Sequence, residues 1–394
     1  MVVEKFKINV KQPVLKDLTR RLDTTRWPDE IADAGWEFGT NLAYLKSLVA
    51  YWRDGYDWKK QEAALNRLPQ YRLDLDGQNV HFVHVHGRGP GPLPLIITHG
   101  WPGSFVEMVK LIPLLTDPAA HGGNAADSFD VVVPSLPGYG FSDRPQARGM
   151  NPRRIAALWA RLMDALGYQR FGAQGGDWGS AVSSALGLDH SERIIGTHLN
   201  YIPGRFLLGG TLGGTPSDAI AGAYQAKLRG WWDSEGGYNH LQATKPQTLA
   251  YGLNDSPVGL AAWILEKFRT WSDCAGDPER AFSKDELLTN IMIYWITETI
   301  SSSTRLYWEG REQPLRLSVG NWVKPPVAVA LFPKEIPMPP RELAERGYNI
   351  ARWTDMPVGG HFAAMEQPEL LASDLREFFR SLRRTAAPPG HPRG

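Results

Sequence analysis

The spacing of apolar positions changes along the chain and divides it into four stretches. The first, residues 1–92, opens on a helical pattern of four aliphatic side chains: Val14, Leu15, Leu18 and Leu22. A second helical pattern covers residues 41–68, and residues 71–87 then alternate like a hairpin with Asp76 and Gly77 near its turn. We therefore expect an N-terminal extension of two helical stretches, followed by the first hairpin of the main domain.

Residues 93–203 alternate between strand and helix patterns, as parallel α/β units do. Buried strand candidates occupy four runs of apolar residues, at 94–100, 129–138, 170–177 and 193–200. Helical patterns at 153–166 and 180–188 alternate with these strands. The alternation predicts a mostly parallel sheet with helices on both faces.

Residues 204–317 lose the strand signals and predict helices rich in Trp and Tyr. The alternation of strand and helix patterns resumes in residues 318–394. Its strand and helix patterns lie at 326–335, 339–347, 349–362 and 368–384. The helical stretch is therefore predicted to be a cap inserted into one α/β domain. The Gly-rich segment 209–216 predicts a flexible loop, and the tail 385–394 a disordered end.

Composition and charge narrow the class of function. Of the 394 residues, 42% are hydrophobic and 22% are charged, as in an ordinary globular protein. The formal net charge of +1 argues against nucleic acid as the main partner, because phosphate binding usually leaves a clearly basic footprint. A small neutral or weakly polar substrate fits this charge better.

Cysteine content and the lengths of apolar runs indicate the compartment. The single Cys274 excludes an internal disulfide and suits a reducing environment. The first residues carry charges too early for a secretory signal, and no apolar run approaches the ~20 residues that a membrane-spanning helix needs. We expect a soluble, cytoplasmic protein.

Two histidines invite a metal interpretation that their spacing does not support. His84 and His86 share one face of the predicted hairpin, but no third ligand is spaced to join them. We expect both to lie on a solvated face and predict no metal site.

The sequence GGDWGS at residues 175–180 has the spacing of a nucleophile elbow, a sharp turn between a strand and a helix. Gly175, Gly176 and Gly179 allow the tight turn, but Asp177 occupies the position where a serine is expected. The alternative is a Gly-rich turn in which Asp177 only caps the helix. The order of strand, turn and helix favours an elbow that presents an aspartate nucleophile.

A second motif supplies candidate donors for an oxyanion hole. ITHGWPGS at residues 97–104 ends an earlier strand, where α/β-hydrolases take one backbone N–H donor. The backbone N–H groups of Trp101 and Trp178 are the natural pair, although Gly and Pro alone also explain a turn at HGWPG. Such donors contribute about 3 kcal/mol each to a tetrahedral intermediate.

A histidine and an acid complete the candidate set. In hydrolases of this chain order the histidine comes last, and His361 lies between the last predicted strand and the last helix. The acid is expected between Asp177 and His361. Glu335, just beyond an apolar strand, is preferred over Asn200 after an earlier strand and over Asp355, which is expected on a connecting loop.

An aspartate nucleophile changes the type of reaction. Its carboxylate is ionised at neutral pH, attacks without a base and suits an sp³ carbon that carries a leaving group. The product is an ester of Asp177, which water activated by His361 can hydrolyse. A halide leaves as a stable anion, whereas an epoxide oxygen needs acidic donors such as tyrosine hydroxyls. The elbow alone leaves both leaving groups open.

Seven segments point to one family: RRLDTTRWPDE, HGWPGS, GGDWGS, TKPQTLAYGLNDSPVGLAAWILEKF, YWITETISSSTRLYWE, LFPKE and GGHFAAMEQPE. Together they resemble the microsomal-type epoxide hydrolases, an α/β-hydrolase family with an N-terminal wrapping segment, over about residues 5–383. The resemblance implies an α/β-hydrolase fold with an inserted helical cap. It also implies hydrolysis of aryl or alkyl epoxides to vicinal diols, without a metal or an organic cofactor.

The resemblance assigns roles to particular residues. The family's nucleophile, acid and histidine fall on three of them: Asp177, Glu335 and His361. Its two cap tyrosines, which donate to the epoxide oxygen, fall on Tyr238 and Tyr307. Tyr251 is a nearby competitor for the first of these, and ordinary packing is the alternative role for each.

Partners also follow from the resemblance. The implied substrate is a small-molecule epoxide bound between cap and core, in detoxification or in a natural-product pathway. Some bacterial relatives are homodimers, so a homodimer is one expectation. The start of the chain lacks the membrane-anchoring segment of mammalian members, and we therefore expect a soluble, bacterial-like member with no membrane anchor.

Two other functions stay open. A haloalkane dehalogenase shares the aspartate nucleophile and often the tryptophan after it, although the paired tyrosines and residues 1–92 favour an epoxide. A catalytically silent small-molecule-binding protein could share the fold. The complete set of Asp177, Glu335 and His361 argues against it.

Overall fold

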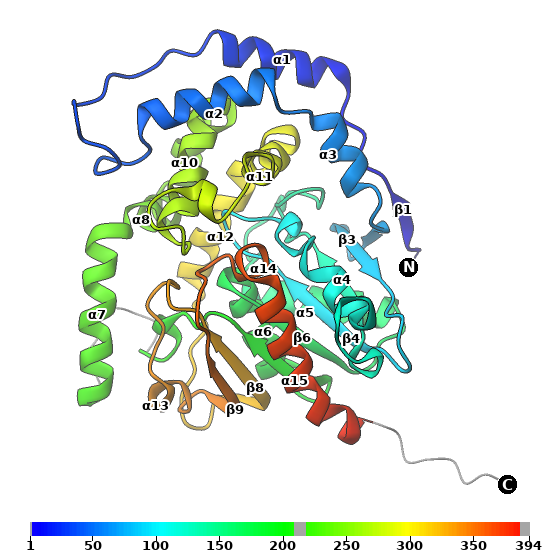
Figure 1. The fold of residues 1–394 in the computed structure, drawn as a ribbon. Coiled ribbons are helices and arrows are strands. Elements are labelled where there is room, and N and C mark those ends of the chain that lie inside the picture. Colours follow the sequence, from blue (N-terminus) through cyan, green and yellow to red (C-terminus); the bar gives the residue numbers. More distant parts are fainter. Residues whose placement is uncertain (1, 209–217, 387–394) are drawn as a thin grey trace, which may run out of the picture.

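A nine-stranded mixed sheet lies at the centre of the computed structural model, which describes residues 2–208 and 218–386 (Figure 1). The order across the sheet is β1-β2-β3-β5-β4-β6-β7-β8-β9. Strands β1, β2, β3 and β5 pair in antiparallel fashion, and the strands from β5 to the β9 edge run parallel. The bounds are β1 Glu4–Phe6, β2 Gln70–Asp74, β3 Asn79–Val85, β4 Leu93–Thr98, β5 Phe129–Pro134, β6 Phe171–Gly175, β7 Ile194–Leu199, β8 Val323–Leu331 and β9 Tyr348–Asp355.

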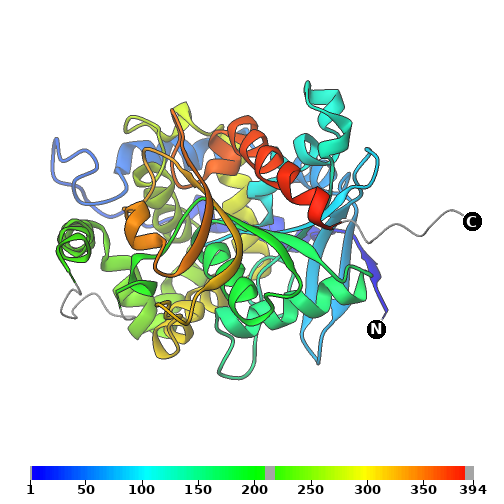
Figure 2. The same cartoon turned by 90° about the horizontal axis from the view of Figure 1, so that it is seen from below.

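Helices cover both faces of this sheet (Figures 1 and 2). Helices α5 and α6 pack together on one face, and α4 and α15 pack together on the other. The central strands are therefore buried on both sides, which explains why they read as continuous apolar runs rather than as alternating ones. The bounds are α4 Leu111–Thr116, α5 Pro152–Ala165, α6 Asp177–Asp189, α13 Arg341–Ala344, α14 Ala363–Glu366 and α15 Pro368–Ala386.

The predicted helical cap lies between β7 and β8, where the described residues form α7 to α12 (Figure 1). Ser283 and Glu286 form a capping box at the start of α11, so the local sequence explains why this helix begins here. The bounds are α7 Ala219–Glu235, α8 Gly237–Thr244, α9 Pro246–Asp255, α10 Pro257–Thr270, α11 Lys284–Thr297 and α12 Ile300–Glu312. Five short 3₁₀ helices occur in the described chain: η1 Phe105–Met108, η2 Pro118–His121, η3 Ala125–Asp127, η4 Gly204–Phe206 and η5 Pro278–Arg280.

Side-chain hydrogen bonds fix the cap to the loops that follow two core strands. The Tyr294 hydroxyl of α11 donates to the carbonyl of Gly103, after β4, over 2.7 Å. The Ser302 hydroxyl of α12 donates to the carbonyl of Gly138, after β5, over 2.6 Å. Both bonds are buried, so they hold α11 and α12 in place over the core loops.

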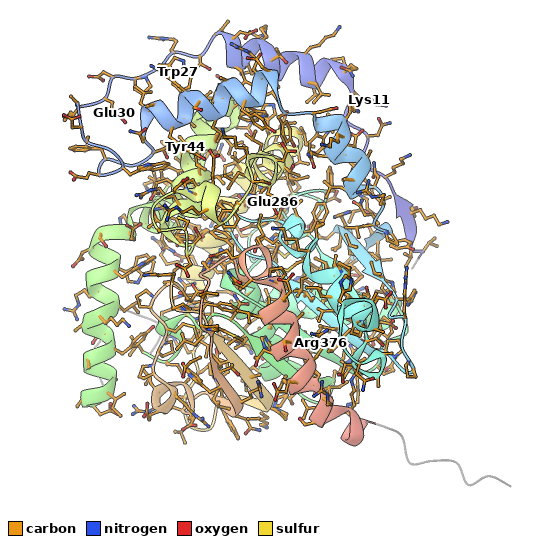
Figure 3. All side chains as sticks on the ribbon, viewed as in Figure 1. Lys11, Trp27, Glu30, Tyr44, Glu286 and Arg376 are labelled. Carbon is orange, nitrogen blue, oxygen red and sulfur yellow. The ribbon has the colours of Figure 1, made fainter. Side chains whose placement is uncertain are left out.

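The N-terminal segment runs along the outside of the cap through α1 (Gln12–Asp23), α2 (Leu42–Asp54) and α3 (Trp58–Leu65) (Figure 1). Figure 3 labels residues along it, including Trp27 and Tyr44, and shows Glu286 of the cap below them. The Tyr51 hydroxyl donates to Asp285 over 2.8 Å, and the Thr40 hydroxyl donates to the carbonyl of Ala262 over 2.7 Å. The segment therefore bonds directly to α10 and α11.

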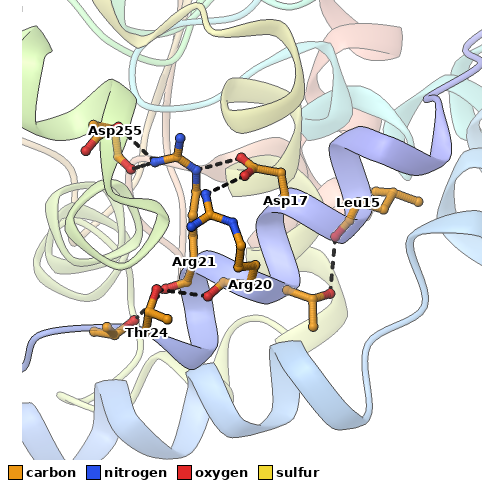
Figure 4. A network of polar contacts seen from close by, with 8 residues as sticks. Leu15, Asp17, Arg20, Arg21, Thr24 and Asp255 are labelled. Atoms are coloured by element: carbon orange, nitrogen blue, oxygen red, sulfur yellow. Dashed lines mark hydrogen bonds and ion pairs between the residues drawn. The ribbon is translucent and has the colours of Figure 1, made fainter.

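A polar network joins α1 to the cap as well (Figure 4). Arg21 donates from Nε to Asp17 within α1 and from Nη1 to Asp255 at the end of α9, over 2.6 and 2.8 Å. Arg20 donates to the other oxygen of Asp17 over 2.7 Å. Because these groups are partly or fully exposed, we expect the network to orient α1 more than to stabilise the fold.

The fold class predicted from the sequence is confirmed: a mostly parallel α/β sheet carries helices on both faces, an inserted helical cap and an N-terminal extension. The predicted hairpin is β2 and β3. Its turn residues Asp76 and Gly77 both have positive φ, as a two-residue type I′ turn requires. The division of the chain after residues 92, 203 and 317 stays a prediction.

Local predictions needed correction at several points. The helical stretch 41–68 is two helices, because the chain turns at Gly55 and Asp57 then caps α3. Strand β1 was not predicted, since three residues at a sheet edge are too few to show alternation. The helix expected at 339–347 is limited to the four residues of α13.

Other predictions concern the ends, a loop and two histidines. Helix α15 continues to Ala386, two residues into the tail predicted to be disordered. The rest of that tail and the predicted loop 209–216 lie outside the described residues. His84 is not on a fully solvated face, because its Nε2 lies 3.1 Å from the Tyr168 hydroxyl, whereas His86 is exposed.

Two classes of feature are absent from the described part of the chain. None of its helices combines the length and the apolar character needed to cross a membrane. Within residues 2–208 and 218–386, no three metal-binding side chains gather in a candidate metal site.

A buried carboxylate on α15 ties this helix to the sheet. Asp374 is 3% exposed and accepts hydrogen bonds from Arg352 and Thr354 of β9, and its Oδ2 lies 3.0 Å from Nε2 of His198 in β7. Although burial alone raises the pKa of Asp374, the hydrogen bonds from His198, Thr354 and Arg352 outweigh it and lower the pKa to about 2.

We predict that Asp374→Ala lowers the free energy of unfolding by about 3–5 kcal/mol at neutral pH, because it leaves its buried partners without an acceptor. The folded-state pKa lies below the unfolded one, so this contribution is present above about pH 4 and is lost as the pH falls toward 2. Denaturant unfolding followed by circular dichroism at pH 7 and pH 3 measures it. Glu377→Ala, which removes an exposed partner of Arg352, is the control and should cost less than about 1 kcal/mol. Equal effects of the two substitutions would contradict the prediction.

Candidate active site

The predicted elbow exists as a strand, a sharp turn and a helix. Asp177 is the first residue of α6, directly after β6 and Gly176, and has φ of +46°, which is unusual for a residue other than glycine. The turn packs tightly against the loop after β4, because a Cβ on Gly179 would lie 1.9 Å from the Thr98 carbonyl oxygen. Glycine at this position therefore lets α6 start close to β4.

The carboxylate of Asp177 is held between the β4 loop and His361. The backbone N–H of Trp101 donates to Oδ1 over 2.8 Å, and Oδ2 lies 3.5 Å from Nε2 of His361. Gly100 makes room for the elbow, since a Cβ there would lie 2.3 Å from Cβ of Asp177. Trp178 is the second residue of α6, so its backbone N–H has no acceptor within the helix. Both predicted oxyanion donors thus belong to residues that adjoin Asp177 in space or in sequence.

The predicted acid and histidine meet on the other side of the site. Nδ1 of His361 lies 2.5 Å from Oε1 of Glu335, which also accepts the backbone N–H of Ile336 over 2.7 Å. Asp355 ends β9 and is exposed, and Asn200 accepts a hydrogen bond from Gln174. Of the three residues considered for the acid position, the structure therefore pairs Glu335 with His361.

Electrostatics favour a charged imidazole between these two carboxylates. Burial alone lowers the pKa of His361, but Glu335 and Asp177 outweigh it and raise the pKa well above its ordinary value. For Glu335, burial raises the pKa, while His361 and the Ile336 N–H oppose the shift. Glu335 and Asp177 therefore favour the charged form of the His361 imidazole.

Both predicted cap tyrosines point their rings at the elbow. Tyr238 of α8 stacks on Trp101 with ring centroids 5.3 Å apart, and Tyr307 of α12 meets Trp178 edge to face at 4.9 Å. The two tyrosine rings lie 5.8 Å apart and both are buried. The competitor Tyr251 is 74% exposed on α9, so the structure does not bring it to the site.

The two tyrosine hydroxyls are protonated in this environment. Burial raises the pKa of Tyr307 well above its ordinary value, and Tyr238 and Asp177 push in the same direction. Burial and Asp177 also raise the pKa of Tyr238. The Tyr307 hydroxyl has no hydrogen-bond partner among residues 2–208 and 218–386, so it is an unused donor.

A pocket opens between the cap and the core above Asp177. Its empty space is about 560 Å³, including the part open to solvent. The lining is mostly aromatic and aliphatic and comes from both parts of the chain: Asp177, Trp178, Ala181, Tyr201, Pro203, Gly204, Arg205, Leu228, Trp231, Trp232, Tyr238, Asn239, Tyr307 and Ile336. Such a lining suits an apolar small molecule with a few polar groups.

A second, smaller cavity lies behind Asp177 and has room for roughly one water molecule. His361, Asn200 and Glu107 of η1 are among its polar lining. The Glu107 carboxyl fills the space left by Gly103, where a Cβ would lie 1.5 Å from Oε1. Burial raises the pKa of Glu107 to about 8; the charge of His361 opposes this shift and that of Asp177 adds to it.

Sequence reasoning missed Glu107, Tyr201 and Arg205 as residues of the site. Glu107 lies eight positions after His99, and the other two follow β7 in the sequence YIPGR. The available signal was their place after parallel strands, whose carboxyl ends meet at one edge of the sheet. It is weak, because many residues of such loops face solvent.

Comparison with known proteins identifies the family. A family described as "Epoxide hydrolase N terminus" matches residues 3–108, and one described as "alpha/beta hydrolase fold" matches residues 94–201. A protein of Stigmatella aurantiaca named "Putative epoxide hydrolase" is 49% identical over 382 residues, which are 96% of this chain and 85% of that one. Epoxide hydrolase 1 of Sus scrofa is 39% identical over 95% of this chain and 88% of its own.

A solved structure agrees with these sequence relatives. The juvenile hormone epoxide hydrolase of the silkworm Bombyx mori superposes with a TM-score of 0.85 and 30% identity, over 98% of this chain and 96% of that one. The match extends through the N-terminal segment, the core and the cap, so the likeness is not limited to the common α/β sheet. This chain therefore belongs to the epoxide hydrolase family of enzymes, within the α/β-hydrolase superfamily.

Proposed function

We propose that this enzyme hydrolyses an epoxide to a vicinal diol through a covalent ester on Asp177. The observation that carries the proposal is the position of Asp177. Its carboxylate lies 3.5 Å from His361 and borders a pocket that Tyr238 and Tyr307 enter from the cap. The nucleophile and two proton donors thus border one space that a small molecule can enter, and the base lies beside the nucleophile.

In the first step, an oxygen of Asp177 attacks one epoxide carbon and the C–O bond to that carbon breaks. The released oxygen takes a proton from a tyrosine hydroxyl, with Tyr238 and Tyr307 both donating to it as charge develops. The unused Tyr307 hydroxyl gains its acceptor only when the epoxide binds. The aromatic walls of the pocket favour aryl or alkyl substituents on the ring.

In the second step, water attacks the carbonyl carbon of the Asp177 ester. Ester formation removes the negative charge of Asp177, which is one of the causes that raise the pKa of His361. The imidazolium can then give its proton to the tyrosinate left by ring opening and act as a base toward water, with Glu335 fixing its orientation over 2.5 Å. The N–H groups of Trp101 and Trp178 stabilise the tetrahedral oxyanion. Its collapse releases the diol, whose oxygen takes the proton from His361. The Asp177 carboxylic acid then gives its proton to the neutral imidazole, which restores the carboxylate and the imidazolium.

The small cavity behind Asp177 is the proposed position of the attacking water. It borders both the carboxylate to be hydrolysed and His361, and it lies apart from the substrate pocket. Burial favours the protonated form of Glu107, whose carbonyl oxygen can accept one hydrogen bond from this water. The water then has two polar partners besides the ester carbon.

Haloalkane dehalogenation is the second candidate function. The indole N–H groups of Trp101 and Trp178 are buried and have no hydrogen-bond partner in the described chain, and such donors can hold a halide. The two tyrosines and the named relatives support the epoxide instead. Halide release from a haloalkane panel, without turnover of styrene oxide, would reverse this choice. A catalytically silent binding protein is disfavoured by the same relatives and by the assembled Asp177, Glu335 and His361.

The covalent ester can be observed directly. We predict that a single turnover of styrene oxide in ¹⁸O-water labels the Asp177 carboxylate, because water attacks its carbonyl carbon rather than the epoxide. The variant His361→Gln should accumulate the enzyme with an added mass of one substrate molecule. Peptide and intact-protein mass spectrometry measure both. Label that appears in the diol alone after one turnover would show direct attack by water.

Ring opening should depend on both cap tyrosines. We predict that Tyr238→Phe and Tyr307→Phe each slow it by about a hundredfold, the range typical of a positioned proton donor. Rapid-mixing tryptophan fluorescence under single-turnover conditions gives the rate. Tyr251→Phe, which removes an exposed hydroxyl of the same cap, is the matched control and should keep the wild-type rate. Equal rates in all three variants would remove the proposed acid role.

The cavity residue Glu107 should affect the second step alone. We predict that Glu107→Leu slows ester hydrolysis by about tenfold or more and leaves ring opening unchanged, because the water loses a polar partner. Glu107→Gln, which keeps a neutral acceptor of the same size, should retain most of the rate. The two phases of the single-turnover trace separate these effects. An equal loss in Leu and Gln variants would mean that the water does not use Glu107.

A further inference from the structure

Arg205 is a cation that lines the proposed substrate pocket. It lies in η4, after β7, and lines the pocket together with Asp177 and Tyr238. No ion pair or hydrogen bond to its guanidinium occurs among the described residues, and its buried Nε lacks any acceptor there. Residues 209–217, which the structure does not describe, contain no Asp or Glu. No carboxylate of residues 2–208 and 218–386 therefore forms an ion pair with Arg205, and residues 209–217 cannot supply one.

Aromatic side chains and a glycine hold the guanidinium in place. Its carbon lies 5.5 Å from the ring centroid of Trp178 and 5.8 Å from that of Phe206. Nη2 approaches α12 at Gly310, where a Cβ would lie 4.0 Å away. A guanidinium packed on rings keeps its planar set of N–H donors oriented, which a solvated side chain does not.

The cation is close to the reacting groups but separate from them. Gly310 lies three residues after Tyr307 on α12, about one helical turn or ~5 Å along the axis. Trp178, on which Arg205 packs, directly follows the proposed nucleophile Asp177. The pocket therefore has an electrophile-binding end at Asp177 and the tyrosines, and a cationic wall about one helical turn away.

We propose that the substrate is an epoxide that carries a carboxylate, and that Arg205 binds this carboxylate while the ring lies at Asp177. The inference rests on the proposed function and adds the substrate class. A planar carboxylate accepts two parallel N–H bonds from a guanidinium, and its single negative charge matches the single arginine. An aromatic ring or a short chain between the two groups suits the separation and the Trp-rich walls.

The electrostatics of the site are consistent with an anionic substrate. Asp177 bears the charge that attacks the ring, so a carboxylate in the same pocket is repelled unless a cation lies nearer to it. Arg205 supplies that cation, and partial burial strengthens the attraction relative to bulk water. A neutral epoxide leaves the guanidinium unpaired in a pocket from which the substrate excludes part of the solvent.

The test compares matched substrates: styrene oxides with a carboxylate, its methyl ester or a sulfonate at the para or meta position. We expect the wild-type enzyme to favour the carboxylate over the ester in kcat/KM. Arg205→Gln should lower kcat/KM for the carboxylate by about 10- to 100-fold and leave the ester nearly unchanged. The ester measures any loss that comes only from packing on Trp178.

Arg229→Gln is the matched control, because Arg229 is exposed on α7 and its loss changes the net charge equally. It should alter neither substrate. A wild-type enzyme that does not prefer the carboxylate, or an equal loss for both substrates in Arg205→Gln, overturns the inference. A preference for the sulfonate overturns the assignment to a carboxylate.

The outcome also separates this inference from the proposed function. Turnover of neutral epoxides without a carboxylate preference leaves the hydrolase function standing and rejects the role of Arg205. If no epoxide is turned over, the proposed function fails. In that case, tryptophan quenching measures how tightly the carboxylate-bearing diol and its methyl ester bind, and this tests Arg205 alone. If the wild-type enzyme binds the carboxylate diol more tightly than the ester diol and Arg205→Gln does not, the anion site is supported. Equal binding of the two diols by the wild-type enzyme rejects it.

Discussion

The charge on His361 is the interaction on which the rest of the site depends. Glu335 lies 2.5 Å from one ring nitrogen and Asp177 lies 3.5 Å from the other, so the imidazole is between two carboxylates. Burial alone would favour the neutral ring, and the two carboxylates reverse this preference. A change in the charge of Asp177 therefore changes the basicity of His361. In the proposed mechanism, this coupling lets one side chain be a counter-ion to the nucleophile in one step and a base toward water in the next.

The fold creates this arrangement by ending neighbouring parallel strands at one edge of the sheet. Asp177 follows β6, Glu335 follows β8 and His361 follows β9, so residues far apart in the chain meet after short connections. Strand β7 lies between β6 and β8, and the chain beyond it carries Arg205 into the same space. The cap closes the pocket from above, and the N-terminal segment bonds to α10 and α11 of that cap. The N-terminal segment thus restrains the cap, and the cap restrains the pocket beneath it.

The sequence indicated the parts of this site that are local or ordered along the chain. The elbow is predictable because strand, glycines and helix are contiguous, and Glu335 and His361 follow from chain order after recognisable strands. The roles of Tyr238 and Tyr307 came from family resemblance, since nothing in a helical pattern distinguishes a pocket tyrosine from a packed one. Tyr238 stacks on Trp101 and Tyr307 meets Trp178 edge to face, and both contacts depend on the tertiary structure. Strand β1 and the break at Gly55 were missed for a different reason. Both features are local, but each covers too few residues to show a pattern.

Glu107 and Arg205 mark the limit of sequence reasoning about charge. A net charge of +1 suggested a neutral substrate, but a sum over 394 residues carries no information about which charges are paired. Most arginines that contact a carboxylate here do so at the surface, where the pair contributes little. Arg205 differs because its Nε is buried without an acceptor in the described chain, and Glu107 differs because burial raises its pKa. Whether a charge is compensated depends on three-dimensional neighbours, so an unpaired cation beside a nucleophile becomes informative about substrate only once the fold is known.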